Sequence, residues 1–132
     1  MTTNNGIESE LPIVRVLVVD DDCMVLRVLC AMLKMHGCEV ASTSQPREAL
    51  RLFQNSPGGF EAVVSDIRMP QLNGIEFGRL IRDIRSDMPL LFVSGTGPPP
   101  ELGQLPGVAA GFLDKPVHPK ELIQELNKLM HS

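Results

Sequence analysis

The feature that most limits the fold of this chain is a regular alternation of two hydrophobic patterns. Short runs, most of them apolar and rich in β-branched residues, are typical of buried strands and fall at residues 14–19, 39–42, 62–65, 90–94 and 111–114. Between and after them, apolar residues recur three or four positions apart, which is the spacing of a helix with one buried face. Strands and helices that alternate through short links form a parallel sheet with helices on both faces. The pattern therefore predicts an α/β fold.

The helical stretches carry recognisable beginnings and ends. The first covers residues 24–37, where Gly37 should stop the helix and Asp22 is a candidate cap. The second should be capped by Ser44, carry Pro46 in its first turn and end at the Pro-Gly-Gly that follows. The later helices are predicted from apolar stripes, which are Phe77, Leu80, Ile81 and Ile84 in one and Leu122, Ile123, Leu126, Leu129 and Met130 in the other.

Charge and length exclude several classes of protein. The net charge is −4, so direct binding of nucleic acid by this domain is not expected. No apolar run approaches the length of a membrane span, and the N-terminus lacks the basic start and apolar centre of a signal peptide. The three cysteines, an odd number with no C-x-x-C pair, favour reduced thiols. We therefore expect a cytoplasmic protein without membrane contact, with a flexible tail over residues 1–12 and one domain over residues 13–131.

Polar residues gather at the carboxyl ends of the predicted strands. They are Asp20, Asp21 and Asp22 after the first strand, Asp66 after the third, Ser94 at the end of the fourth and Lys115 after the fifth. In an open parallel sheet these ends lie along one edge, and ligands bind where the strand order reverses. The sequence therefore predicts one site built from acids, a hydroxyl and an amine that are far apart in the chain.

These residue types suit phosphoryl transfer. Clustered carboxylates repel each other, and a hard divalent cation such as Mg2+ relieves that repulsion through oxygen ligands. Asp66 can then act as a carboxylate nucleophile of the kind that forms an aspartyl phosphate. Lys115 can pair with Asp66 and later with a phosphoryl oxygen, and Ser94 can donate a hydrogen bond to another phosphoryl oxygen.

Each of these residues also has an ordinary structural explanation. Acids after the first strand can cap a helix, and an acid such as Asp66 is common in turns. Ser94 can be a loop hydroxyl and Lys115 a solvated lysine. These explanations would have to coincide at the ends of four strands, and we therefore favour the combined functional interpretation.

Four motifs, in this order, resemble the response-regulator receiver domain of two-component signalling. They are VLVVDDD at the first strand, SDIRMPQLNG around Asp66, VSG at the fourth strand and FLDKP at the fifth, and the resemblance covers about residues 13–131. It implies a flavodoxin-like, doubly wound, five-stranded parallel sheet in the order 2-1-3-4-5 with five helices. It also implies a cis peptide bond between Lys115 and Pro116.

The resemblance also implies a role for each site residue. Asp66 would be the phosphoacceptor. Asp20, Asp21, Asp66 and the backbone carbonyl of Arg68 would hold Mg2+, Ser94 and Lys115 would bind the phosphoryl group, and Phe112 would be the aromatic switch residue. The donor would be a histidine kinase or a histidine phosphotransfer protein, and the domain would slowly hydrolyse its own aspartyl phosphate. On this interpretation the domain is a signalling module rather than an enzyme.

Two other functions are open at this point. A phosphohydrolase of the haloacid dehalogenase type also uses an aspartate nucleophile, Mg2+, a hydroxyl and a lysine, and Asp20 and Asp22 have its spacing. Its usual threonine is replaced here by Met24, however, and no later acidic pair follows Lys115 at a strand end. A pseudo-receiver that only binds partners is the other alternative, and the retained acids, Ser94 and Lys115 argue against it.

The segment after the fourth strand departs most from the family. It reads GTGPPPELGQLPGVAAG, and proline cannot lie inside a helix, so Pro106 should end whatever begins near Glu101. We predict a fourth helix that is short, irregular or partly mobile, and a response to phosphorylation that appears as ordering or shifting of residues 96–108. No output domain is expected within residues 1–132, and a stand-alone receiver and a part of a longer regulator or hybrid kinase are both open alternatives.

Overall fold

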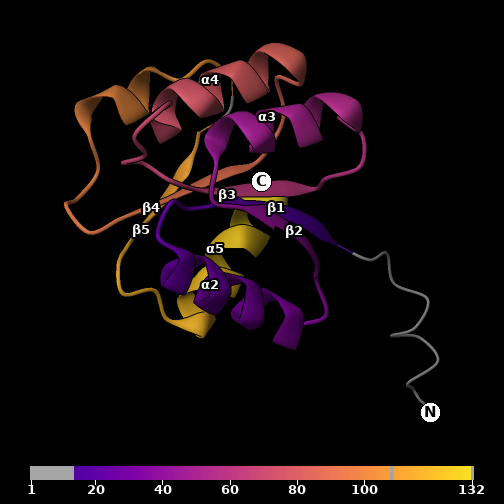
Figure 1. Cartoon of the computed structure of the whole chain (residues 1–132), viewed down its shortest axis with the longest axis vertical. Helices are drawn as coiled ribbons and strands as arrows, with labels where there is room; N and C mark the ends of the chain where they lie inside the picture. The colour runs from indigo at the N-terminus through magenta and orange to yellow at the C-terminus, as the bar shows by residue number, and fades with distance from the viewer. Residues whose placement is uncertain (1–13, 108, 132) are drawn as a thin grey trace.

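One parallel sheet of five strands forms the centre of the molecule (Figure 1). The computed structural model describes residues 14–107 and 109–131, and the tail expected over residues 1–12 lies outside them. The strands are β1 (Arg15–Val19), β2 (Glu39–Thr43), β3 (Ala62–Asp66), β4 (Leu90–Ser94) and β5 (Gly111–Asp114). Their order is β2-β1-β3-β4-β5 and every pair is parallel, which confirms the flavodoxin-like order. The order reverses between β1 and β3, so the point expected to bind ligands lies where these two strands end.

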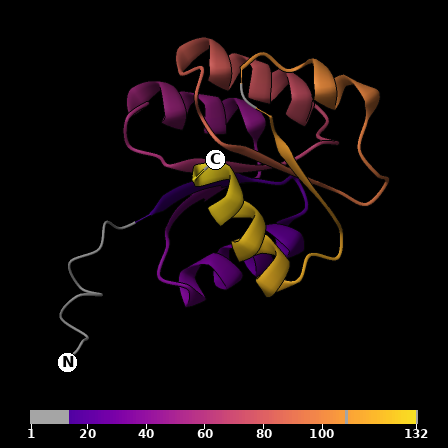
Figure 2. The same ribbon diagram turned by 180° about the vertical axis from the view of Figure 1, so that it is seen from behind.

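Helices cover both faces of this sheet (Figure 1 and Figure 2). On one face lie α2 (Cys23–Met35) and α5 (Pro119–Met130), and on the other lie α3 (Pro46–Asn55) and α4 (Gly74–Ile84). Successive residues of a strand point to opposite faces. Val16 and Val18 therefore join the core cluster beneath α2 and α5, whereas Leu17 and Val19 join the cluster beneath α3 and α4. β3 and β4 are buried along their whole length, as strands in the middle of such a sheet must be.

The first helix begins and ends as predicted. The Asp22 carboxylate accepts hydrogen bonds from the backbone N–H groups of Met24 and Val25, and it thereby caps α2. Gly37 follows the helix with a φ of +83°, the left-handed conformation in which helices commonly end. Of the three acids after β1, Asp22 therefore serves the helix.

The predicted cap of the second helix is wrong. Ser44 does not cap α3, because Gln45 occupies the N-cap position and makes no side-chain capping bond. The reason is that β2 extends to Thr43, whose Oγ1 accepts the N–H of Gln45 at 3.2 Å. The helix then starts at Pro46, since the fixed φ of proline suits a first helical position and its missing N–H needs no partner there.

The apolar face of α4 is shifted from its predicted position. Phe77 and Ile81 are fully buried, as predicted. Leu80 and Ile84 are 38% and 40% exposed, so that half of the predicted stripe is wrong. Gly78 explains the shift, because a Cβ at this position would lie 2.8 Å from a ring carbon on β4. The helix approaches the sheet closely along its glycine side, and Leu80 and Ile84 are turned toward solvent.

The predicted short fourth helix is a 3-10 helix, η1 (Pro100–Gln104). It follows two prolines, begins at a third and ends before Pro106, and proline is not tolerated in a helix interior. The described residues thus form four α-helices and this one 3-10 helix, in agreement with a short fourth helix among five. Within the same residues, no helix combines the length and the hydrophobicity needed to cross a membrane.

Candidate functional site

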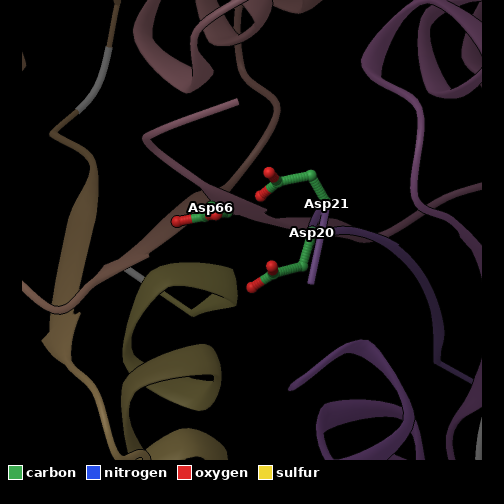
Figure 3. Close-up of side chains that lie close together, drawn as sticks. All are labelled: Asp20, Asp21 and Asp66. Carbon is green, nitrogen blue, oxygen red and sulfur yellow. The ribbon is translucent and has the colours of Figure 1, made fainter. Parts of the chain in front are cut away.

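Three acids from two adjacent strands converge at the carboxyl edge of the sheet (Figure 3). Asp20 and Asp21 follow β1 directly and Asp66 ends β3, and these strands are paired neighbours. One carboxylate oxygen from each acid lies within 4.8 Å of the others. Asp20 is fully buried and Asp66 is 5% exposed, whereas Asp21 is exposed. The predicted acids are therefore brought together, two below the surface and one on it.

One carboxylate oxygen of Asp20 accepts a hydrogen bond and the other does not. Its Oδ1 accepts the backbone N–H of Asp22 at 2.9 Å. Its Oδ2 lies 3.0 Å from Lys115 Nζ as an ion pair. That contact falls outside hydrogen-bond geometry, so Oδ2 is a buried side-chain atom without a hydrogen bond among the residues described. Buried polar atoms rarely lack a hydrogen bond, so this oxygen, although it is paired with Lys115, can still accept a further ligand.

Lys115 joins the acids from the end of β5. Its backbone N–H donates to the carbonyl of Ser94 at 2.9 Å, and its Nζ lies 3.3 Å from Asp66 Oδ1. The bond between Lys115 and Pro116 is cis, as predicted. Pairing with Asp66 was expected from the sequence, whereas the closer contact with Asp20 was not, because no spacing in the sequence indicates how far the lysine reaches along the sheet edge.

Burial and the nearby charges together raise the pKa of Asp66 to about 6. Burial is the largest cause and the negative charge of Asp20 is the second, and the positive charge of Lys115 opposes both. For Lys115, burial acts to lower the pKa, but the neighbouring carboxylates of Asp20 and then Asp66 outweigh it and raise the pKa. The site thus holds more negative charge than one lysine compensates, which favours the binding of a cation.

Asp66→Asn should stabilise the fold at neutral pH. Because the folded-state pKa of Asp66 lies above the usual carboxyl value, the folded protein holds this proton more tightly than the unfolded chain, and ionisation costs stability as the pH rises through about 6. We expect the variant to raise the free energy of unfolding at neutral pH, without Mg2+, by about 1–2 kcal/mol. The gain should shrink as the pH falls toward about 4, where the wild-type side chain is protonated in the fold. Urea denaturation at the two pH values measures it.

A matched control for this experiment lies on α4. Asp83 is exposed, so Asp83→Asn should change the free energy of unfolding little at either pH. A gain from Asp66→Asn that is equal at both pH values would contradict the argument from charge crowding.

Ser94 lies next to the acids at the end of β4 and is 2% exposed. Its Oγ lies 3.1 Å from Oγ1 of Thr96 and accepts the Thr96 N–H at 3.2 Å. Thr96 Oγ1 in turn accepts the Nε–H of Arg68 at 3.1 Å. The hydroxyl predicted to bind a phosphoryl group is therefore engaged with Thr96. The link from Arg68 through Thr96 to Ser94 is one that no sequence motif indicates.

Phe112, the residue expected to act as a switch, lies in β5 opposite Phe92 of β4. Its side chain is partly buried and packs against the core cluster on the face of α3 and α4. This position is next to the site rather than in it, and the switch role stays a prediction.

A family model described as the response regulator receiver domain matches residues 16–127. Two-component response regulator ARR11 of Arabidopsis thaliana is 37% identical over 111 residues, which cover 82% of this chain and 21% of that protein. Response regulator MprA of Mycolicibacterium vanbaalenii is 35% identical over 120 residues, which cover 89% of this chain and 50% of that protein. The chain thus spans between a fifth and a half of the length of these curated relatives.

Solved structures agree with this assignment. The chemotaxis response regulator CheY4 of Vibrio cholerae is similar with a TM-score of 0.79 and 28% identity, covering 89% of this chain and 99% of that one. A response regulator receiver domain protein from Clostridium thermocellum has a TM-score of 0.80 and 27% identity, covering 89% of this chain and 94% of that one. With the strand order, the acid cluster and these similarities in agreement, the chain belongs to the response regulator receiver domain family.

Proposed function

We propose that this receiver domain is a phosphorylation switch that accepts a phosphoryl group on Asp66 from the phosphohistidine of a histidine kinase or a histidine phosphotransfer protein. The observation that carries the proposal is the position of Lys115 Nζ, 3.0 Å from Asp20 and 3.3 Å from Asp66. A carboxylate nucleophile, a cation beside it and further acids able to hold a metal ion form the charge arrangement that phosphoryl transfer needs.

The acid cluster fits a magnesium ion. Asp20 Oδ2 is buried without a hydrogen bond, and Asp21 and Asp66 offer further oxygens within 4.8 Å. We assign the backbone carbonyl of Arg68 as the remaining protein ligand, since Mg2+ prefers oxygen donors and keeps several waters. When bound, the ion would offset negative charge on the phosphoryl group during transfer.

The side chains of this domain would carry out the transfer. An oxygen of the Asp66 carboxylate attacks phosphorus while the P–N bond to the donor imidazole breaks, and the imidazole leaves with that electron pair. Lys115 exchanges its contact with Asp66 for one with a phosphoryl oxygen, and Ser94 leaves Thr96 to donate to another. Water later attacks phosphorus, inorganic phosphate is released and the carboxylate is restored. Slow hydrolysis of this kind makes the domain a transient switch rather than an enzyme with turnover.

Incubation with acetyl phosphate and Mg2+ tests the proposal. Intact-mass spectrometry should show the gain of one phosphoryl group, and hydroxylamine should remove it, because an acyl phosphate is labile to this nucleophile. An excess of EDTA should prevent the gain. Protein that remains unmodified, or a phosphoryl group that resists hydroxylamine, would argue against an aspartyl phosphate.

Asp21→Asn should weaken magnesium binding without disturbing the core, because Asp21 is the exposed member of the cluster. We expect the Kd for Mg2+ to rise by about tenfold, equivalent to about 1.4 kcal/mol. A titration followed by the NMR signals of residues near Asp20 and Asp66 measures it. Asp114→Asn, which changes an exposed acid outside the cluster, should leave the Kd unchanged. If both variants bind like the wild type, the acids are not the magnesium site.

An apolar groove beside the site suits a protein donor. It has a volume of about 410 Å3 and lies between α2 and the segment after β5, lined by Met24, Val25, Val28, Leu29, Met32, Lys115, Pro116 and Val117. Met24 and Val28 are 68% and 49% exposed. Exposed apolar side chains gathered in one place commonly mark an interaction surface. Because Lys115 lines the groove and contacts Asp66, a donor seated there would bring its phosphohistidine to the acids.

Val28→Lys should distinguish a protein donor, which would use the groove, from the small-molecule donor acetyl phosphate, which would not. A charge in the groove should slow transfer from a phosphorylated histidine phosphotransfer domain at least about tenfold, as expected for a central apolar contact, while leaving the rate with acetyl phosphate unchanged. Met35→Lys is the control, because Met35 is exposed on the same helix but does not line the groove. Equal slowing by both variants would attribute the effect to charge alone and not to the groove.

The phosphohydrolase alternative is less well supported. In that class the nucleophile would be Asp20, the acid after β1, which is fully buried and paired with Lys115. Asp66, at the end of β3, keeps 5% of its surface exposed, whereas Asp20 keeps none. Failure to hydrolyse a generic phosphomonoester, together with labelling by acetyl phosphate, would separate the two functions.

The remaining proposals concern the cellular location of the domain and its binding partners. We propose a cytoplasmic location, in keeping with three free cysteines among the residues described and with a donor that is a histidine kinase or phosphotransfer protein. Neither nucleic acid nor membrane is proposed as a direct partner of this domain. Its output partner, or an output domain elsewhere in a longer protein, would read the phosphorylated state.

A further inference from the structure

The connection between β4 and β5 has one end that is closely packed and one that is open. We propose that Arg82 is a buried latch that fixes this connection at residues 105–107, so that residues 95–104 pivot about that end when Asp66 is phosphorylated. The pivot rests on the proposed function, because the connection begins directly after Ser94, one of the residues assigned to the phosphoryl group. The latch itself is a property of the unmodified protein.

Arg82 reaches from α4 into both the connection and the turn before β4. It is only 3% exposed. Its Nη1 donates to the carbonyl of Pro106 at 2.9 Å, and its Nε and Nη2 both donate to the carbonyl of Met88 at 3.2 Å. The guanidinium is planar and rigid, so it serves both carbonyls only while they keep this relative position. Hydrogen bonds from a charged donor are also stronger than neutral ones. Arg82 therefore ties the connection to the body of the domain.

Gly107 shows close backbone packing at the same end. Its φ is +88°, and a Cβ at this position would lie 2.6 Å from the carbonyl oxygen of Ser86 and 3.7 Å from Arg82 Cδ. Both the conformation and the space therefore require glycine. Leu105 adds a hydrophobic contact with the core cluster on this face, and Leu102 of η1 makes one with the same cluster. The end at residues 105–107 is thus held by polar, steric and apolar contacts at once.

The end next to the acids has room to move. A Cβ at Gly95 or at Gly97 would meet no atom within 4 Å. Between them, Thr96 is bonded to Ser94 and to the exposed Arg68. The proposed reaction takes Ser94 away from Thr96, and this releases both hydrogen bonds between the Ser94 hydroxyl and Thr96. A displacement that starts at Ser94 would therefore move residues 95–104, including η1, whereas residues 105–107 stay in place.

NMR of the arginine side chains tests the latch and the pivot. In the unmodified protein, Arg82 Nε–H should give a resonance protected from solvent exchange, and Nε–H of the exposed Arg79 on the same helix should not. Addition of Mg2+ and beryllofluoride should shift the backbone amides of residues 94–97. The amides of Leu105 and Gly107 and the Arg82 resonance should stay close to their original positions. Loss of Arg82 protection, or shifts at residue 105 as large as those at residues 94–97, would overturn the pivot.

Arg82→Met removes the donors and keeps an unbranched apolar stem. The backbone heteronuclear NOE of Leu105 and Gly107 should fall in the unmodified protein, because the Pro106 carbonyl between them loses its hydrogen bond from a charged donor. The beryllofluoride response should then spread to these two residues. Arg79→Met, the matched control on α4, should behave like the wild type, and an Arg82→Met protein that also does so would overturn the latch. Should Arg82→Met not fold, Arg82→Lys keeps a single charged nitrogen without the planar guanidinium, and it should give a smaller effect in the same direction.

If the proposed function is wrong, the same experiments give a different result. In that case no amide near Asp66 would respond to beryllofluoride and Mg2+, and the pivot would be overturned with it. The protection of Arg82 and the lower heteronuclear NOE in Arg82→Met are measured without beryllofluoride, and they would still decide whether Arg82 is a latch.

Discussion

Asp66→Asn is expected to abolish phosphorylation of this domain by acetyl phosphate and Mg2+. The amide that replaces the carboxylate has no anionic oxygen to attack phosphorus, so no acyl phosphate forms. The neighbouring acids are not substitutes in the same position, because Asp20 is fully buried beneath the site and Asp21 lies on its surface. Intact-mass spectrometry should therefore show no hydroxylamine-sensitive phosphoryl group on the variant.

The interpretation of this loss depends on an intact fold. The gain in unfolding free energy expected for Asp66→Asn provides that control in the same protein, since an unfolded variant would show a loss. Asp83→Asn changes an exposed acid on α4 and should be phosphorylated like the wild type. A phosphoryl group that still appears on Asp66→Asn would rule out Asp66 as the phosphoacceptor.

Gly74→Ala is expected to be one of the most destabilising small substitutions in the chain. Gly74 begins α4 and donates its N–H to the carbonyl of Ile67 at 2.8 Å. A Cβ at this position would lie 2.2 Å from the backbone carbonyl oxygen of Asp66 and 2.9 Å from Ile67 Cα. Neither atom belongs to a flexible side chain, so the backbone itself must move. We expect a loss of about 2–3 kcal/mol in the free energy of unfolding, measured by urea denaturation.

The same substitution should also impair phosphorylation, because the displaced backbone is that of Asp66. The rate with acetyl phosphate should fall even under conditions in which Gly74→Ala is fully folded. Gly58→Ala is the matched control, since a Cβ at Gly58 meets no atom within 4 Å. An unchanged urea midpoint for Gly74→Ala would contradict the close approach of α4 to β3.

The strands and most of the helices could be predicted from the sequence because their signals are local, whereas the order of the strands was implied by the family resemblance. The apolar runs at β1, β3 and β4 are buried on both faces, and this produces continuous hydrophobicity that no amphipathic helix would show. The short fourth helix could likewise be predicted from its prolines, since their effect on a helix is a property of the residue itself.

The errors arose where a neighbour in space decided the outcome. Ser44 is a good capping residue, but pairing of β2 with β1 carried the strand as far as Thr43 and moved the helix start. Leu80 has the right spacing for a buried stripe, but Gly78 lets α4 approach the sheet along another side. Helical periodicity limits the buried face to a range of directions, and packing selects one of them.

The candidate site, too, was predictable from local sequence in part and was decided by packing in part. The sequence by itself determined that Asp20, Asp66, Ser94 and Lys115 follow strands, and a parallel sheet brings such strand ends to one edge. Only the tertiary structure decided that Lys115 lies closer to Asp20 than to Asp66, or that Asp20 keeps a buried oxygen without a hydrogen bond. The physical reason is that a strand end is fixed by local patterning, whereas distances between side chains depend on the twist and packing of strands that are far apart in the chain.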